Sequence, residues 1–398
     1  MRLRRREEVG MKNQTAHMNN QSLGRTLRLV MQTQRITKPD IAVQLGVSLP
    51  TASQNVRLLM EHGLLAYDGT AESTGGRKAQ TVVPVPEARV ALGLDITANQ
   101  VRGVLVNLQG AELASFTHTL AFSNTDGYFA ELSEKTQMFL QSNRIEKARL
   151  LGTGISIPGV LSADGRMLVR SHVLQVEHLP TAAFFDHLWG ACAICNDAKA
   201  AAIAELWQWN DLGTAAYLSL SESVGGALVI DNRIYEGAHC RGGEFGHMTL
   251  VPDGRRCYCG QYGCLDAYCN ATVLAGQAES LAAFFGALEE GEPACVRVWH
   301  RYAEHLAMAI NSIVTMLDCP VILGGLVGAQ MSRNLLQELL QRVQERATFE
   351  IQENQLLLCR HRHNTAAVGG ALQLVHSFLQ TGYQTLFETE RVTNSRRQ

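Results

Sequence analysis

The sequence has no apolar run long enough to span a lipid bilayer, and its N-terminus has no apolar signal segment. It also has no internal repeat of fixed short period. These absences predict a cytoplasmic protein with no membrane partner. Hydrophobic residues make up 46% and charged residues only 18% of the 398 positions, which is typical of a globular protein of two or three domains. Because the cytoplasm is reducing, the ten cysteines are expected to be thiols or metal ligands rather than disulfides.

The net charge is small, at −2, but it is unevenly distributed. Residues 1–89 hold 13 Lys and Arg against 7 Asp and Glu, a balance of +6, whereas the remainder holds 22 against 30, a balance of −8. A basic N-terminal part on an acidic body indicates a polyanion partner for the N-terminal part alone. Residues 1–20 show no periodicity and are expected to form a disordered tail, although their arginine cluster could also contact nucleic acid.

Residues 21–81 carry the pattern of a winged helix-turn-helix domain. Ser22 and Ser48 are placed to cap two helices, and Gly46 closes a short helix between them. The last helix buries one apolar face and turns small polar and basic residues outward, and a strand–turn–strand wing follows. The alternative to a DNA-binding domain is an ordinary three-helix bundle whose polar face is simply solvated. The predicted contacts to double-stranded DNA are Thr51, Ser53, Gln54 and Arg57 in the major groove, and Arg77 of the wing in the minor groove.

Two prolines in VVPVPEAR predict a linker over residues 82–89, after which the composition changes. From residue 90 to the end, strands are interleaved with helices, which predicts an α/β domain in two lobes.

Residues 244–266, called here the cysteine loop, concentrate metal-ligand chemistry. Three thiols and one imidazole are the ligands of a closed tetrahedral zinc site, with no open position for a catalytic water. The alternative to a metal site is that these cysteines are reduced thiols packed in an apolar core. A glycine-rich loop, however, has little core for them to fill. We therefore predict one structural Zn²⁺ per chain, bound by His247, Cys257, Cys259 and Cys264.

Six segments in a fixed order, LGLDI, GISIPG, CNDAKAAAIAE, GGEFGH, CYCGQYGCLD and VILGG, resemble those of the ROK family of sugar kinases and sugar-responsive repressors. The resemblance covers roughly residues 88–380 and implies the two-lobed actin/hexokinase-like fold. The N-terminal domain is similar to that of the family's regulators. The cysteine loop with GGEFGH before it is the most specific part of the match.

The resemblance also implies a set of sugar-binding residues. In the family, the position of Asp197 is the general base that takes a proton from the sugar hydroxyl, and Gly159 is near the same pocket. Carboxylates and amides suit a polyol because each oxygen accepts a hydroxyl proton in a fixed direction. The family usually has Glu where this chain has Asp266, which shortens the reach by one methylene. The implied ligand contacts are Asn196, Asp197, Glu244, His247 and Asp266.

Two of the three phosphate-binding elements of the family's kinases are altered in this chain. The Asp-x-Gly-Gly-Thr turn is DITAN at residues 95–99, so both glycines that close backbone amides around a phosphate are absent. The second element contains Glu222, whose charge has the wrong sign to face a triphosphate. The third keeps Gly324 and Gly325. Because phosphoryl transfer depends on positioning and neutralising the phosphate, we predict that the chain is not an enzyme.

These observations favour a transcriptional repressor of carbohydrate metabolism genes, controlled by a sugar or sugar phosphate. A single winged helix reads a short half-site, so a homodimer or a higher homo-oligomer on a palindrome is expected. Two alternatives remain at this point: an active sugar kinase with an accessory DNA-binding domain, and a sugar-independent dimeric adaptor.

Overall fold

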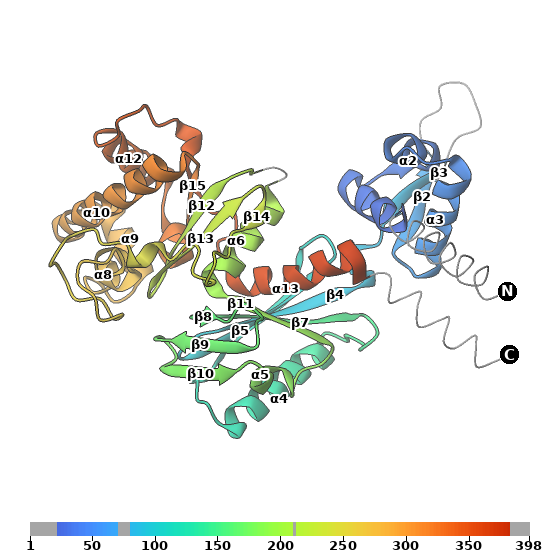
Figure 1. Cartoon of the computed structure of the whole chain (residues 1–398), viewed down its shortest axis with the longest axis horizontal. Coiled ribbons are helices and arrows are strands. Elements are labelled where there is room, and N and C mark those ends of the chain that lie inside the picture. The colour runs from blue at the N-terminus through green and yellow to red at the C-terminus, as the bar shows by residue number, and fades with distance from the viewer. Residues whose placement is uncertain (1–21, 71–79, 210–211, 383–398) are drawn as a thin grey trace, which may run out of the picture.

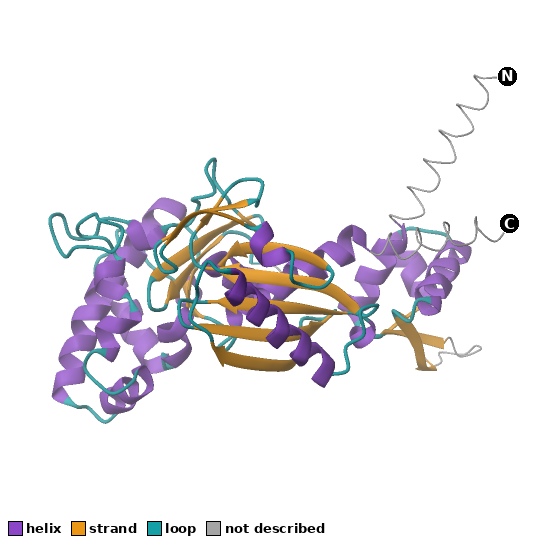
Figure 2. Cartoon of the chain, turned by 90° about the horizontal axis from the view of Figure 1, so that it is seen from below, coloured by secondary structure: helices purple, strands orange, loops and turns teal. Residues whose placement is uncertain are grey.

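The computed structural model describes residues 22–70, 80–209 and 212–382. They form a small N-terminal domain, called the head, and two larger lobes, each built on a five-stranded sheet (Figure 1). The head lies at one end of the molecule, and the helices of lobe II gather at the opposite end (Figures 1 and 2). Within the described part of the chain, no helix is both long enough and apolar enough to cross a membrane.

The head has the predicted winged helix-turn-helix architecture. Residues 22–33 are helical and are followed by β1 (Ile36–Thr37), α2 (Lys38–Leu45), α3 (Leu49–Glu61), β2 (Leu65–Thr70) and β3 (Gln80–Pro84), with sheet order β1-β3-β2. Local chemistry sets the helix boundaries. Gly46 ends α2 in the left-handed conformation (φ 65°), and the Ser48 hydroxyl accepts a hydrogen bond from the Thr51 amide at the start of α3. Ala52, Val56 and Leu59 of α3 are fully buried, so the last helix of the head buries one apolar face as predicted.

The expected linker is more ordered than its prolines suggest. Strand β3 runs on through residues 82–84, and the 3₁₀ turn Pro86–Ala88 follows directly. Only residues 85–89 therefore lie between the head sheet and the first strand of lobe I. The predicted tail at residues 1–20 and the tip of the wing, with Arg77, lie outside the described residues.

Lobe I contains the sheet β11-β7-β4-β5-β6, formed by Ala191–Asn196, Leu150–Ile157, Val90–Ile96, Gln100–Asn107 and Glu112–Thr119. Strand β4 is buried along its whole length because helices cover both faces of the sheet. Helix α4 (Asp126–Ser142) packs on one face and α13 (Thr365–Ser377) on the other (Figure 1). A small sheet, β10-β9-β8 (Val176–Pro180, Met167–Ser171, Val160–Leu161), and α5 (Ala182–Phe185) complete the lobe.

Lobe II contains the sheet β14-β13-β12-β15-β16, formed by Arg233–Ile234, Val224–Ile230, Ala215–Leu220, Val321–Gly324 and Leu356–Leu358. Its largest apolar core lies between this sheet and a helical cluster around the long helix α10 (Pro293–Leu317). The other helices of the lobe are α7 (Asp266–Cys269), α8 (Ala271–Ala275), α9 (Leu281–Glu289), α11 (Gly325–Gln330) and α12 (Arg333–Gln344), with short 3₁₀ turns at Phe245–His247 and Glu353–Gln355.

Two helices meet between the sheets of the two lobes. Helix α6 (Asp197–Gln208) packs on the lobe II sheet, and α13 packs on the lobe I sheet. They approach at backbone distance, because a Cβ on Gly369 of α13 would lie 1.7 Å from the carbonyl oxygen of Ala200 in α6. Glycine is required at that contact. The α6–α13 pair therefore joins the two lobes along a tightly packed seam.

Candidate functional site

A cavity of about 640 Å³ lies between the lobes, and residues from both line it. Strand β11 ends at Asn196 and α6 begins at the next residue, so two polar side chains project from the carboxyl edge of the lobe I sheet. Lobe II contributes the start of the cysteine loop and the β12–β13 turn. Four of the five predicted sugar contacts line this cavity: Asn196, Asp197, Glu244 and His247, together with Gly159.

Asn196 and Asp197 are held by the strand-to-helix junction. The Asn196 side-chain oxygen accepts a hydrogen bond from the Lys199 amide at 3.1 Å, and its Nδ2 donates to the Gly159 carbonyl at 3.1 Å. One carboxylate oxygen of Asp197 accepts from the Ala198 amide at 2.9 Å. Burial in the cleft wall, then the nearby charges of Asp95 and Glu244, raise the pKa of Asp197 to about 6. This carboxylate is therefore an unusually good hydrogen-bond acceptor for a hydroxyl group.

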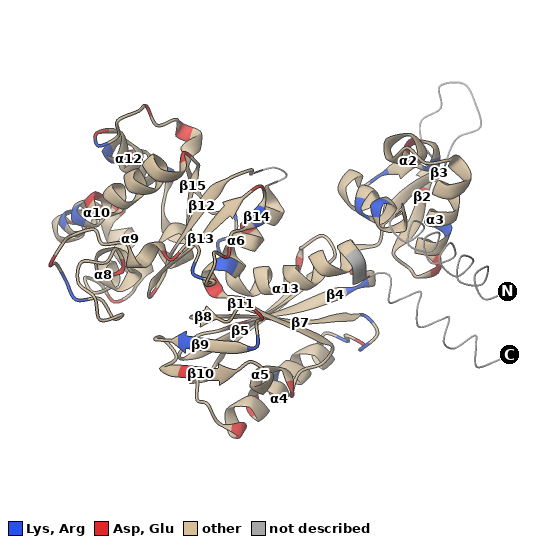
Figure 3. Ribbon diagram, viewed as in Figure 1, with Lys and Arg blue, Asp and Glu red and all other residues tan. Residues whose placement is uncertain are grey.

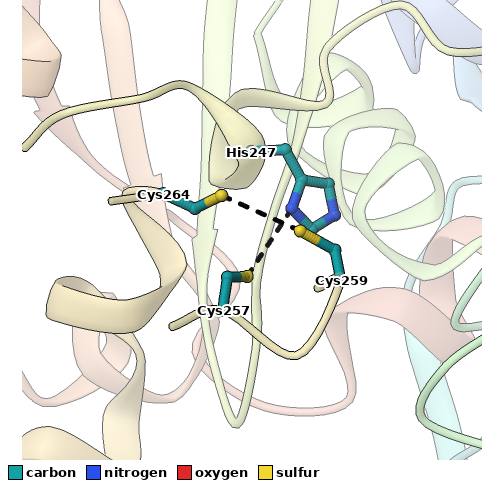
Figure 4. Close-up of side chains that lie close together, drawn as sticks. All are labelled: His247, Cys257, Cys259 and Cys264. Atoms are coloured by element: carbon teal, nitrogen blue, oxygen red, sulfur yellow. Dashed lines mark hydrogen bonds between the residues drawn. The ribbon is translucent and has the colours of Figure 1, made fainter. Parts of the chain in front are cut away.

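The four predicted zinc ligands converge in the cysteine loop (Figure 4). Their ligand atoms all lie within 4.8 Å of one another, and the Sγ atoms of Cys259 and Cys264 are 3.8 Å apart. Two thiolates on a tetrahedral Zn²⁺ at about 2.3 Å would be separated by about 3.8 Å. His247 turns Nδ1 toward the Sγ of Cys257, at 3.9 Å. The geometry and the donor set both fit a tetrahedral zinc ion.

His247 also connects the cluster of three cysteines to the cavity. Its second ring nitrogen, Nε2, is 3.4 Å from the hydroxyl of Tyr258, a residue between two of the cysteines. Tyr258 and His247 both line the cavity. A ring held through Nδ1 by the metal cluster would have a fixed orientation at the cavity wall.

Asp266 is placed differently from the other four predicted sugar contacts. Its side chain is only 3% exposed and does not line the cavity. One oxygen accepts a hydrogen bond from the Val224 amide at 2.6 Å, and the other lies 4.0 Å from the Sγ of Cys257. Burial raises the pKa of Asp266, and the Val224 amide opposes that shift. Asp266 thus ties the cysteine loop to the start of β13 from behind the cavity wall.

The three segments that match the kinase phosphate elements surround a second, adjoining cavity of about 310 Å³. Asp95 lies in its wall, accepts a hydrogen bond from Ser156 at 2.9 Å and is 3.6 Å from Arg102. Burial nevertheless raises the pKa of Asp95. Glu222 and Leu326 also line this space. The altered residues of these three segments therefore line one cavity.

The four predicted major-groove contacts lie on α3. Gln54 and Arg57 are exposed, whereas Thr51 and Ser53 are partly buried. The Thr51 hydroxyl is 2.8 Å from that of Ser48, and the Arg57 guanidinium is 3.7 Å from Glu61. Charges of both signs lie on the head as well as on the lobes (Figure 3), and the described residues of the head up to residue 89 hold six Lys and Arg against four Asp and Glu.

Several residues at these sites were not predicted from the sequence. Tyr258, His172 and Arg241 line the first cavity. Tyr258 lies between two cysteines of the cluster and Arg241 directly precedes GGEFGH, so their positions could have indicated them, but nothing local marks His172. On the head, Val43 is 80% exposed and Leu49 is 48% exposed. Apolar side chains outside the buried stripe of a DNA-reading domain can contact thymine methyl groups.

A winged helix-turn-helix head joined to a two-lobed, sugar-kinase-like body defines the class of this protein. The chain belongs to the ROK family, whose family model matches residues 91–377. A second model, described as winged helix-turn-helix DNA-binding, matches residues 20–65. The predicted fold class and family are thereby confirmed.

Known relatives include regulators and kinases. The chain is 25% identical over 251 residues to the xylose repressor of Bacillus spizizenii, an alignment that spans 62% of this chain and 65% of the repressor, which is less than two thirds of its length. A ROK family transcriptional regulator, a homologue of the Escherichia coli MLC protein, shares its fold (TM-score 0.75, 20% identity, 92% of this chain and 98% of that one). The glucokinase of Streptomyces griseus, solved with glucose and AMPPNP, has a TM-score of 0.61 at 20% identity, over 71% of this chain and 98% of the kinase.

Proposed function

We propose that this protein is a DNA-binding transcriptional repressor of carbohydrate metabolism genes, whose DNA affinity is set by a sugar or sugar phosphate in the first cavity. The contrast between the two cavities carries this proposal. The first has carboxylate, amide and imidazole groups suited to hydroxyls, whereas the second has Glu222 where a kinase would neutralise phosphates. The similarity to a xylose repressor supports it.

In this proposal Asn196, Asp197, Glu244 and His247 hydrogen-bond the hydroxyl groups of the ligand. They come from both lobes, so a ligand that contacts all four stabilises one particular separation of the lobes. Asp266 supports the site by holding Val224 and the cysteine loop.

A structural Zn²⁺ bound by His247, Cys257, Cys259 and Cys264 holds the cysteine loop in place. Four protein ligands would fill its coordination shell, so the ion would supply no catalytic water. Its contribution is to fix the position of His247 and, through the same loop, of Tyr258.

The head binds double-stranded DNA through α3, with Thr51, Ser53, Gln54 and Arg57 facing the major groove and Arg77 of the wing in the minor groove. A homodimer or higher homo-oligomer places two heads on a palindromic operator in the cytoplasm. Only a ligand with different affinities for the DNA-competent and incompetent arrangements can control such a protein.

The test starts with selection of bound duplexes from a random library by the full-length protein. DNA affinity is then measured by fluorescence anisotropy with D-xylose, D-glucose, N-acetyl-D-glucosamine and their phosphate esters. At least one compound should change the DNA dissociation constant of the wild type, and Asp197→Ala should remove that change without loss of DNA binding. Absence of sequence-selective DNA binding, or of any response to the panel, would contradict the proposal.

An active sugar kinase is the second candidate, because Asp197 is retained and its pKa of about 6 suits a general base. A coupled assay with ATP and the three unphosphorylated sugars separates the candidates. We expect no turnover above that of Asp197→Asn. Turnover that this substitution abolishes would establish the kinase.

A further inference from the structure

The head is packed against the body rather than suspended from a linker. Leu27 and Met31 of the first helix belong to the same apolar core as Phe378 and Leu379, which directly follow α13. A hydrogen bond crosses this contact, from Nη1 of Arg28 to the carbonyl oxygen of Leu379 at 2.7 Å. The end of α13 is therefore one docking point for the head.

A second docking point involves the end of α6. The indole N–H of Trp207, in the last turn of that helix, donates to the carbonyl oxygen of Gln109 at 2.7 Å. The Gln109 side chain then donates to Oε1 of Gln34 in the head, at 2.6 Å. Gly110 lets the turn approach the indole, because a Cβ there would lie 2.6 Å from the indole nitrogen. The head thus touches a turn that α6 holds in place.

The covalent connection between head and body is also tied down on both sides. The Val85 amide donates to the Leu64 carbonyl of the head at 2.9 Å, and the Leu108 amide of lobe I donates to the Pro86 carbonyl at 3.0 Å. Rotation of the head therefore requires its contacts with the ends of α6 and α13 to change.

Both helices begin at the cavities between the lobes. Helix α6 starts with Asp197, which lines both cavities, and Thr365 at the start of α13 lines the second. Each helix spans about 18–20 Å, from the cleft to the head. Gln373 of α13 also donates to the Sγ of Cys195 at 2.8 Å, one residue before Asn196.

Helix α6 packs against both lobes, and its Ala204 and Trp207 share an apolar core with α13 and the lobe I sheet. Ala201 and Ala202 of α6 pack with Tyr217 of the lobe II sheet, whereas α13 lies on the lobe I sheet. A change in the separation of the lobes therefore acts on α6 at its cleft end. Because α6 and α13 are packed at backbone distance, the seam between them must switch between discrete arrangements rather than deform continuously.

We propose that the α6–α13 pair relays the state of the cleft to the DNA-binding head through two contacts, Arg28–Leu379 and Gln34–Gln109–Trp207. The inference rests on the proposed function and adds the route by which ligand occupancy reaches the DNA. When the ligand sets the lobe separation, the two contacts shift relative to each other and the head turns. The DNA-competent orientation is then gained or lost without contact between ligand and head.

The experiment compares wild type with Arg28→Ala, Gln109→Ala and the double variant. Matched controls are Arg25→Ala, whose guanidinium bonds to Leu45 within the head, and Gln141→Ala on the exposed face of α4. For each protein, DNA affinity is measured with and without the panel sugar that affects the wild type most, on the duplex selected above. Affinity for that sugar is measured separately by calorimetry.

The double variant should bind the sugar and the DNA, but the ratio of its two DNA dissociation constants should fall to about 1, against the roughly 5- to 150-fold typical of allosteric coupling. Amide exchange of residues 22–33 should also be faster in the double variant without any sugar. Both controls should retain the wild-type ratio. A double variant whose ratio stays within about twofold of wild type overturns the relay alone. If no panel sugar changes the DNA affinity of the wild type, the proposed function is wrong, and the relay is wrong as well.

Discussion

Replacing Asp197 by Asn should stabilise the ligand-free protein while destroying its ligand response. The carboxylate has a pKa of about 6 in the folded chain, against an ordinary 3.8. This difference corresponds to up to about 3 kcal/mol of unfolding free energy. Asparagine is isosteric, keeps the oxygen that accepts the Ala198 amide, and carries no charge to desolvate. The expected increase in unfolding free energy equals the cost of keeping a charged carboxylate buried at this position, where it can act as a strong hydroxyl acceptor.

The sign of the effect fixes its pH window. A raised carboxyl pKa contributes stability that is fully present below about pH 3.8 and lost as the pH rises through about 6. The difference in unfolding free energy between Asp197→Asn and wild type should therefore be near zero at pH 4, grow between pH 4 and 6, and level off above pH 6. Urea unfolding followed by circular dichroism at several pH values measures it, because a midpoint shift at constant slope reports stability.

Asp186→Asn, at an exposed position of lobe I, is the control and should show no such pH-dependent gain. A variant that is no more stable than wild type at pH 7.5, or a gain that appears only below pH 4, would refute the reasoning.

Three further predictions concern the metal, the helix seam and the DNA surface. Cys259→Ser should lower the zinc content, measured by mass spectrometry, below one ion per chain and lower the melting temperature, whereas Cys240→Ser, outside the cluster, should retain the metal. Gly369→Ala should destabilise the protein in urea by about 1–3 kcal/mol or more, because its Cβ would lie 1.7 Å from the Ala200 oxygen. Gly286→Ala, which meets nothing within 4 Å on helix α9, should be neutral or stabilising by about 0.4–1 kcal/mol. Gln54→Ala should cost about 1–3 kcal/mol of DNA binding and relax base preference at one position, whereas Arg57→Ala should weaken binding to all duplexes and reduce its salt dependence.

Much of the fold could be predicted because its signals are local. The Ser48 cap, the left-handed Gly46 and the buried stripe of α3 involve residues within one or two turns of each other. The same holds for the cysteine loop, where the four ligands come from eighteen consecutive residues, 247–264. In such elements the spacing of residues along the chain restricts how their side chains can be arranged, whatever distant contacts form.

The sequence could not decide between two possible directions of one side chain. A carboxylate next to a zinc ligand could face the sugar or the protein, and its position in the chain is the same in both cases. The structure turns Asp266 inward to the Val224 amide, so the cavity wall is supported by a residue expected to line it. His172 enters the same cavity from a segment with no local pattern, whereas Arg241 directly precedes the GGEFGH segment.

The sequence by itself determined the winged head, the α/β body, the cluster of one histidine and three cysteines and the residue changes at DITAN and Glu222, because each depends on short-range spacing or residue type. Only the tertiary structure decided that the head is docked and that α6 and α13 run from the cleft to it. The bond between Arg28 and Leu379 joins residues 351 positions apart. An apolar stripe in the sequence shows that one face of a helix is buried, but which element buries it depends on the packing of the whole chain.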